Sequence, residues 1–281
     1  FNLLGNALYF KGVIGISESK ADRKGLSKEE MDKGVRETPI LLAYALKELK
    51  LLLRTPVYFL NCVLISLIYP LFILFPLFMG GGSEREEFSM IIENLRTFDR
   101  GTLLLIVLGI GFVLGSVNII ASSAISREGK GLYFMKYIPV SYMTQIYAKI
   151  LSAFFVEALA LIILYGILFY LFSIDVLFLM LSLLVVFLSS LLINQLGIFL
   201  DITWPKLNWD TEQKAVKQNF NSVIHMFLGF GLVALFVFLA FKIQATLYMA
   251  FMVSFISLLL LTLGMHVLLK SHVEKRMKVL S

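Results

Sequence analysis

The first candidate for chemistry is Glu157, because it is the one Asp, Glu, Lys or Arg residue within the long apolar runs of this sequence. It lies about two turns into the run Ile150–Phe172. A charge in hydrocarbon is costly, so such residues normally face the interior of a helix bundle or a watery cavity. Three roles stay open: a proton-relay carboxylate, a contact for substrate or gating, and a headgroup-level or hydrogen-bonded glutamate near the cytoplasmic end of the span. A proton-driven carrier usually has more than one such group, and no other run holds an acidic partner.

Amide and small side chains form a second group. Asn61, Asn118 and Asn194 each lie in a different apolar run. Hydrogen bonds between helices, worth about 0.6 kcal/mol on average, are the simplest explanation, and lining a translocation path is the alternative. Glu157 and the three asparagines are therefore the candidates for such a path. A stripe of small residues indicates close helix packing, either within the chain or between two bundles: Gly109, Gly111, Gly115 and Ser116.

The most informative stretch follows the run Thr102–Ile125. It reads Ser126-Arg127-Glu128-Gly129-Lys130-Gly131, then LYFMKYIPVS, and extends to Lys149. The charged cluster, the glycines, the short aromatic run and Pro139 together predict a helix, a turn and a second short helix along the membrane surface. Such an element would offer apolar side chains to a groove in a partner: Leu132, Phe134, Met135, Tyr137 and Ile138. The alternative is an ordinary interfacial loop whose aromatic residues lie at headgroup depth.

Several chemistries are disfavoured by missing motifs. The sequence contains no G-x-x-x-x-G-K-[ST] phosphate-binding loop, no G-x-S-x-G and no H-E-x-x-H. The histidines lack the spacing of metal or haem ligands, and the single cysteine, Cys62, can form no disulfide within the chain. We therefore expect no enzyme activity, no cofactor and no metal in this chain.

The composition places these residues in a membrane protein. Of the 281 residues, 59% are hydrophobic and 16% are charged, and the mean hydropathy is +0.86. Ordinary soluble domains carry about 25% charged residues, and a soluble fold of this size cannot hide so much apolar surface. A spanning helix needs about 20 apolar residues. Six runs qualify, which predicts an all-α, polytopic membrane protein with six transmembrane helices: Val57–Met79, Thr102–Ile125, Ile150–Phe172, Val176–Leu200, Val223–Phe241 and Ala245–Leu269.

The basic residues predict the orientation of the spans. Of the 25 Lys and Arg residues, 21 lie on the side that holds both ends of the bundle, and four lie on the other side. The positive-inside rule makes the richer side cytoplasmic. We therefore expect an integral protein of the cytoplasmic (plasma) membrane with both ends of the bundle inside. The net charge of +6 is then a topology signal and not a sign of nucleic-acid binding. The outer connection Gly80–Gly101 is expected to be exposed and to hold a short helix.

The chain before the first span divides in two. Residues 1–38 are interpreted as the tail of an upstream segment followed by a charged, solvated cytoplasmic linker. Pro39–Arg54 has apolar residues every three or four positions, which predicts an amphipathic helix in the membrane interface. Thr55-Pro56 favours a bend after that helix, and a straight extension of the first span is the alternative. Residues 39–281 are then the transmembrane domain.

The cytoplasmic motifs resemble those of a known family. The run S-R-E-G-K, followed by F-M-K-x-I-P-V-S and Ala148-Lys149, is similar to the ABC transporter permeases of the type-2 exporter class. In that family an Arg-Glu-x-Gly stretch precedes a short coupling helix and a Pro-containing turn. Pro39–Arg54 resembles the family's amphipathic connecting helix, and Asp201–Asn221 (DITWPKLNWDTEQKAVKQNFN) resembles a loop of a bacterial branch of such exporters. The resemblance covers about Pro39 to the end, and the spans match only by character.

The resemblance implies a permease that moves substrate with ATP hydrolysed by a separate ABC-type ATPase subunit. That subunit would hold the ATP and Mg²⁺ and would dock on Arg127–Met143. The residues that couple the two would be Arg127, Glu128, Gly129, Lys130, Phe134, Met135 and Pro139. Glu128 is expected to pair with Arg127 or Lys130. The remaining partners would be membrane lipids and a second permease half, either upstream in a double-length chain or in a homodimer.

Two interpretations from other classes stay open. One is an ion- or proton-coupled carrier that uses Glu157, and the other is a non-transporting membrane protein such as an assembly or immunity factor. The Arg127–Lys130 motif favours the exporter. The apolar spans would suit a lipid, a hydrophobic peptide or a drug as substrate, and the direction of transport follows from the resemblance alone.

Overall fold

The computed structural model describes residues 38–75, 81–172, 175–243 and 245–280. Pro39–Ser281 form one compact unit. The tail and linker expected before Thr38 lie outside the described residues. So do residues 76–79, the last ones expected in the first span, and residues 173–174 and 244, which connect later helices.

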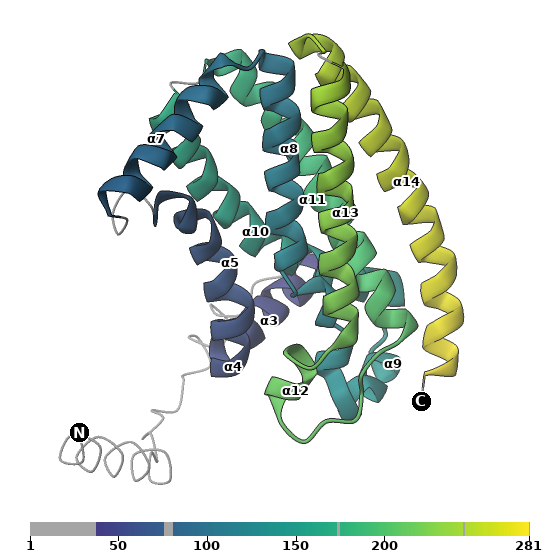
Figure 1. Ribbon diagram of the computed structural model, residues 1–281. Coiled ribbons are helices and arrows are strands. Elements are labelled where there is room, and N and C mark those ends of the chain that lie inside the picture. The colour runs from purple at the N-terminus through teal and green to yellow at the C-terminus, as the bar shows by residue number, and fades with distance from the viewer. Residues whose placement is uncertain (1–37, 76–80, 173–174, 244, 281) are drawn as a thin grey trace, which may run out of the picture. The chain divides into compact units, whose positions relative to one another are not determined.

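The described residues form helices and no strand, which confirms the all-α membrane fold (Figure 1). Five helices are long and apolar enough to cross a membrane, and a bent pair near the start of the unit raises the number to six. The five are α8 (Arg100–Val117), α10 (Tyr142–Phe172), α11 (Val176–Thr203), α13 (Phe220–Ile243) and α14 (Leu247–Val279).

The bent pair corresponds to the predicted interfacial helix and first span. α3 (Ile40–Arg54) ends before Thr55, whose backbone is extended, and Pro56 opens the next helical stretch at 90° to α3. Proline disfavours helical backbone in the residue before it, so the bend falls where the sequence predicts it and the straight extension is wrong. The span continues through α4, a π-helical stretch, α5 and a 3₁₀ stretch: Pro56–Tyr58, Phe59–Leu64, Ile65–Ile68 and Tyr69–Leu74.

The second span is shorter than predicted. α8 ends at Val117 rather than near Ile125, because Asn118 leaves the helical backbone. The Asn118 amide nitrogen donates to the carbonyl of Ala153 on α10 at 3.0 Å, and its amide oxygen accepts from the backbone of Ile120 at 3.1 Å. The apolar residues that follow therefore fold back beneath the bundle in short 3₁₀ turns. These include η3 (Ala121–Ser123) and η4 (Ser126–Tyr133), before α9 (Phe134–Tyr137).

The helix ends nearest the predicted outer connection are joined by polar contacts. α7 (Gly82–Thr97) is the helix expected in the outer connection, and Arg96 near its end donates to the carbonyl of Leu171 at 2.6 Å. Asp99 caps α8 by accepting from the backbone and the hydroxyl of Thr102 at 2.9 and 2.7 Å. Burial raises the pKa of the Asp99 carboxyl, but these hydrogen bonds outweigh it and hold that pKa below its ordinary value. Arg100 forms an ion pair with Asp175 at the start of α11.

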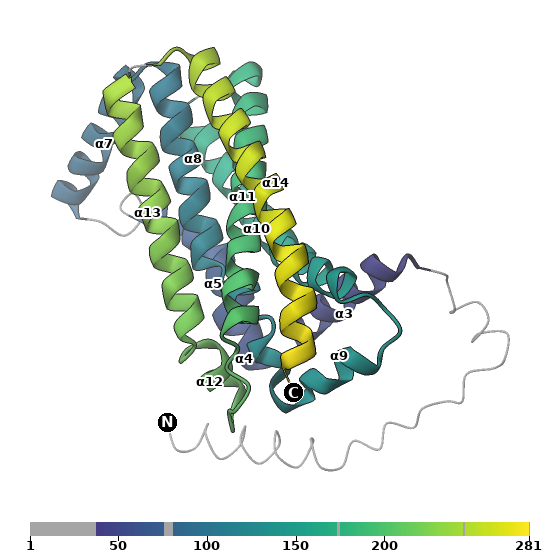
Figure 2. The same ribbon diagram turned by 90° about the vertical axis from the view of Figure 1, so that its right-hand side faces the viewer.

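α8 lies at the centre of the unit, packed against α11 and α13, while α14 packs along α11 (Figures 1 and 2). The small residues make this close approach possible. A Cβ at Gly111 would lie 2.9 Å from Val186 of α11, and Gly229 of α13 faces Ser116 directly. The small-residue stripe therefore packs helices within this chain, and the alternative of packing between two bundles is not needed to explain it.

Candidate functional site

A buried ion-pair cluster connects three segments at the end of the unit that holds α9 and α12 (Glu212–Val216) (Figure 1). Lys149 of α10 lies 3.0 Å from Glu48 of α3, measured from Nζ to Oε1, and it also forms an ion pair with Glu128 of η4. The side chains of Lys149 and Glu48 are only 3% and 2% exposed. We call Glu48, Lys149 and Glu128 the ionic node. A single lysine therefore holds the helix before the first span, the segment after α8 and the start of α10 together.

The ionic node corrects two expectations. Glu128 pairs with Lys149 and not with Arg127 or Lys130. Glu48 is one of the charged residues of the predicted amphipathic helix, and it is buried instead of lying on the polar face of that helix. Both differences follow from α10, which begins eight residues before the predicted start of its span, so that Lys149 lies inside a helix packed on α3.

Arg127 is buried and turned inward. Its Nη1 donates to the carbonyl of Ile120 and to the hydroxyl of Ser123, both at 2.7 Å, and its guanidinium lies 5.7 Å from the ring centre of Tyr58. Among the described residues, its Nε and Nη2 make no hydrogen bond. Arg127 thus holds the turns after α8 against the start of the first span, and in this conformation it cannot touch a docking partner.

A second buried carboxylate, Asp201 at the end of α11, holds the same segment from the other side. It accepts hydrogen bonds from the backbone of Ile125 at 2.6 Å, from the backbone of Ser126 at 2.9 Å, and from the Ser126 hydroxyl. The amide nitrogen of Asn221 donates to it at 3.0 Å. Sequence reasoning missed Asp201 as a functional residue. The available signal was an acidic residue at the end of an apolar run, directly before the Trp- and Asn-rich loop.

Gly129 is required at its position by two independent features. Its φ of 55° is in the left-handed region that favours glycine. A Cβ there would also lie 2.7 Å from the ring of Trp209, whose Nε1 donates to the carbonyl of Ser126 at 2.8 Å. The loop after α11 therefore packs directly against the backbone turn at Gly129.

Only part of the predicted coupling surface faces outward. α9 confirms the expected short helix, but Met135 and the neighbouring Leu132 are buried in the core of this chain. Lys130, Phe134 and Pro139 are exposed, together with Tyr133 and Tyr137. We call Tyr133, Phe134 and Tyr137 the aromatic face. Their rings lie against each other, with centres 4.2 Å apart for Tyr133 and Phe134 and 6.2 Å apart for Tyr133 and Tyr137.

Glu157 lies in the interior of the bundle, which is one of its expected placements, and it is hydrogen-bonded there. It is fully buried, and Nδ2 of Asn194 donates to its Oε2 at 2.6 Å. Its Oε1 has no hydrogen-bond partner among the described residues. Space for the carboxylate comes from Gly115 of α8, where a Cβ would lie 2.7 Å from that oxygen. The site is therefore built by α8, α10 and α11.

The structure brings together some of the predicted path residues and not others. Asn194 contacts Glu157, and Asn118 reaches α10 one turn away at Ala153, so both make the expected bonds between helices. Asn61 instead donates to Val57 of its own helix at 2.7 Å. Within the described ranges, no three or more His, Cys, Asp or Glu side chains form a group that could hold a metal ion.

Together, the long apolar helices and the buried polar sites between them define an integral, multi-span membrane protein. Residues 7–269 match a family described as membrane proteins of 12 transmembrane segments, and the chain belongs to that family. The match does not by itself link the chain to ABC exporter permeases. Comparison with curated proteins and with solved structures gives no match.

Proposed function

We propose that this chain is the membrane-spanning permease subunit of an ATP-binding-cassette exporter, which moves substrate across the cytoplasmic membrane with ATP hydrolysed by a separate subunit. The observation that carries the proposal is the ionic node. Because Lys149 holds Glu48 and Glu128 at once, a displacement of the segment around α9 would be passed to α3 and α10 instead of being absorbed by a loop. A transmitting element of this kind is what a permease driven from outside the membrane needs.

The aromatic face supplies a docking surface for the driving subunit. Phe134 is 58% and Tyr137 is 80% exposed, and aromatic side chains of this kind dominate the binding energy of many protein interfaces. Lys130 and Lys136 lie beside them in sequence and suit an acidic rim on the partner. The ATPase would hold ATP and Mg²⁺, because this sequence has no phosphate-binding loop.

The family description supplies the other proposed partner. The described residues hold five or six candidate spans, whereas the family is described by twelve. We therefore propose a second bundle of spans, in the same polypeptide or in a second copy, with membrane lipids around both. In this arrangement both ends of the present bundle are cytoplasmic.

The docking surface predicts the result of an affinity purification. Phe134→Ala combined with Tyr137→Ala is expected to lower the ATPase recovered with the full-length protein at least about tenfold, since each such anchor contributes about 2 kcal/mol. The measurement is ATP hydrolysis in the eluate from the native membrane. Both side chains are exposed, so the folded chain should keep its stability.

The chain offers a matched control for that variant. Phe169 and Tyr170, near the opposite end of α10, are 60% and 79% exposed, so the double alanine change there removes the same kind of surface. This control should keep the wild-type recovery. No ATPase in the wild-type eluate, under conditions that preserve a known complex, would contradict the proposal.

Glu157 favours a second candidate function, an ion- or proton-coupled carrier. Glu157 is buried and has no cationic partner among the described residues. Such a carboxylate is costly as an anion, so a proton or a bound cation would neutralise it, and either one could be exchanged during a transport cycle. Glu157→Gln keeps the shape and an acceptor for Asn194. If the protein is such a carrier, Glu157→Gln should lower proton flux into protein-containing vesicles at least about tenfold. This corresponds to a rise of about 1.4 kcal/mol in the activation free energy.

The flux is read with an enclosed pH-sensitive dye, and Glu274→Gln on the exposed side of α14 is the control. Equal flux in wild type and Glu157→Gln would exclude the carrier. Loss of flux with ATPase recovery unchanged would favour the carrier over the exporter.

A further inference from the structure

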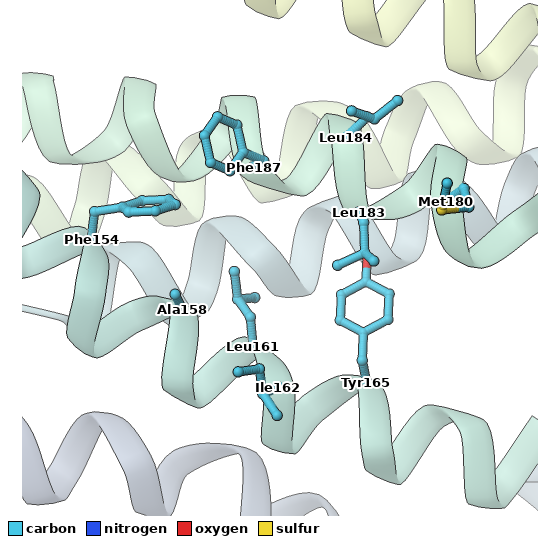
Figure 3. Close-up of a pocket in the computed structure, with 9 residues that line it drawn as sticks. All are labelled: Phe154, Ala158, Leu161, Ile162, Tyr165, Met180, Leu183, Leu184 and Phe187. Atoms are coloured by element: carbon cyan, nitrogen blue, oxygen red, sulfur yellow. The ribbon is translucent and has the colours of Figure 1, made fainter.

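A cavity of about 530 Å³ lies between α10 and α11 and belongs to none of the sites above (Figure 3). Its walls come from one face of each helix, and Ala158, the smallest lining residue, leaves room between the larger side chains. The rim is exposed at Ile162, Met180 and Phe187, so the cavity opens on the outside of the chain. The nine lining residues are Phe154, Ala158, Leu161, Ile162, Tyr165, Met180, Leu183, Leu184 and Phe187.

The length of the cavity suits an acyl chain. Its lining on α10 runs from Phe154 to Tyr165, which is about 16 Å along a helix axis. This is about half of the roughly 30 Å hydrocarbon core of a bilayer, which is the depth that one acyl chain spans. A flexible hydrocarbon chain therefore matches the groove in length.

The chemistry of the lining also fits a hydrocarbon chain. Eight of the nine side chains carry no nitrogen or oxygen, and the exception is the hydroxyl of Tyr165. This hydroxyl is buried and makes no hydrogen bond at bonding distance to any described residue. The neighbouring hydroxyl of Ser182 donates instead to the carbonyl of Leu179 at 3.1 Å. Buried polar groups normally have a partner, so an acceptor on the occupant would satisfy Tyr165.

The geometry points to a binding site for one acyl chain of a membrane phospholipid, and we propose that the groove between α10 and α11 holds it. The acyl chain runs from Tyr165 towards Phe154. The ester carbonyl at the head of this acyl chain accepts the hydrogen bond that the Tyr165 hydroxyl donates. Tyr165 lies seven residues before the end of α10, which places the polar end of the lipid towards the end of the helix and the methyl end towards mid-membrane. The inference does not depend on the proposed exporter function.

Photo-crosslinking tests the site. The full-length protein is reconstituted in vesicles of phosphatidylethanolamine and phosphatidylglycerol with a trace of phosphatidylethanolamine that carries a diazirine midway along one acyl chain. After illumination, labelled peptides are mapped by mass spectrometry. Labels are expected to concentrate on the lining residues of α10 and α11. Ala158→Trp fills the groove and should lower this labelling at least about tenfold, which corresponds to about 1.4 kcal/mol.

Two variants make the result interpretable. Ala234→Trp places the same side chain on an exposed position of α13, outside the groove, and should leave the labelling unchanged. Tyr165→Phe keeps the shape of the groove and removes one hydrogen bond of about 1 kcal/mol. The lipid retained after detergent washing should therefore fall about fivefold. Unchanged retention in Tyr165→Phe would overturn the assigned orientation of the lipid.

Two further results would overturn the site itself. Labels spread evenly over the exposed faces of α10, α11, α13 and α14, unaffected by Ala158→Trp, would mean that the lipid is ordinary bilayer solvent. Labels missing from the groove, with the same residues protected in a detergent-stable dimer, would assign the groove to a second copy of the chain.

Discussion

Lys149→Met is expected to destabilise the folded chain by about 3–5 kcal/mol, the usual cost of leaving a buried charge without its partner. The lysine is almost fully buried and is the shared partner of Glu48 and Glu128. Methionine fills nearly the same volume, so the loss reports the charge and not a cavity. The measurement is the free energy of unfolding of the purified protein in detergent, followed by helix content.

Lys214 forms an ion pair with Asp210, but both side chains are exposed, so Lys214→Met should change the unfolding free energy by less than about 0.5 kcal/mol. Glu48→Gln removes one of the two carboxylates from the ionic node. Combined with Lys149→Met, it should cost less than the sum of the single changes, because the two residues act as one unit. Equal effects of Lys149→Met and Lys214→Met would mean that the ionic node does not hold these segments together.

Asp201→Ala should destabilise the chain to a similar extent, by about 4 kcal/mol or more. Two buried backbone N–H groups, those of Ile125 and Ser126, would lose their acceptor together with the Asn221 side chain, and each stranded group costs about 1–3 kcal/mol. Asp201→Asn should be intermediate, since the amide keeps one acceptor oxygen but turns two N–H donors towards groups that are donors themselves.

Hydrogen exchange locates this effect. In Asp201→Ala, the amides of Ile125 and Ser126 should exchange faster than in the wild type. Amides in the middle of α13 should exchange faster only as far as the loss of global stability requires. Asp210→Ala, at an exposed carboxylate in the loop after α11, is the control and should leave both amides protected. Protection that survives in Asp201→Ala would show that water replaces the carboxylate and that Asp201 does not hold the segment.

The exposure of the aromatic face could not be predicted from the sequence. A run such as Leu132–Ile138 indicates a short apolar helix, but it does not say which residues turn inward. In the structure, Met135 and Leu132 pack in the core, while Phe134 and Tyr137 remain outside. The side that faces inward is set by the residues of other segments packed against α9, which lie elsewhere in the sequence.

The sequence by itself determined the fold class and much of the local structure. Long apolar runs must form helices in lipid, because a spanning backbone has to satisfy its own hydrogen bonds. Most ends of the predicted spans therefore lie within a few residues of the ends of the observed helices. Thr55-Pro56 placed the bend before the first span, since proline restricts the residue that precedes it. The glycines of the second run predicted close packing, because a residue without a side chain lets two helices approach.

Only the tertiary structure decided which polar groups meet. Lys149 joins Glu48 and Glu128, which are 101 and 21 residues away, and Asp201 reaches back 75 residues to Ser126. The end of α8 at Asn118 likewise depends on a carbonyl of α10. Each of these groups must find a partner once it is buried, but the sequence around it does not specify which one. The packing of α3, α10 and α11 makes that choice, and it is what turns scattered charged residues into one connected site.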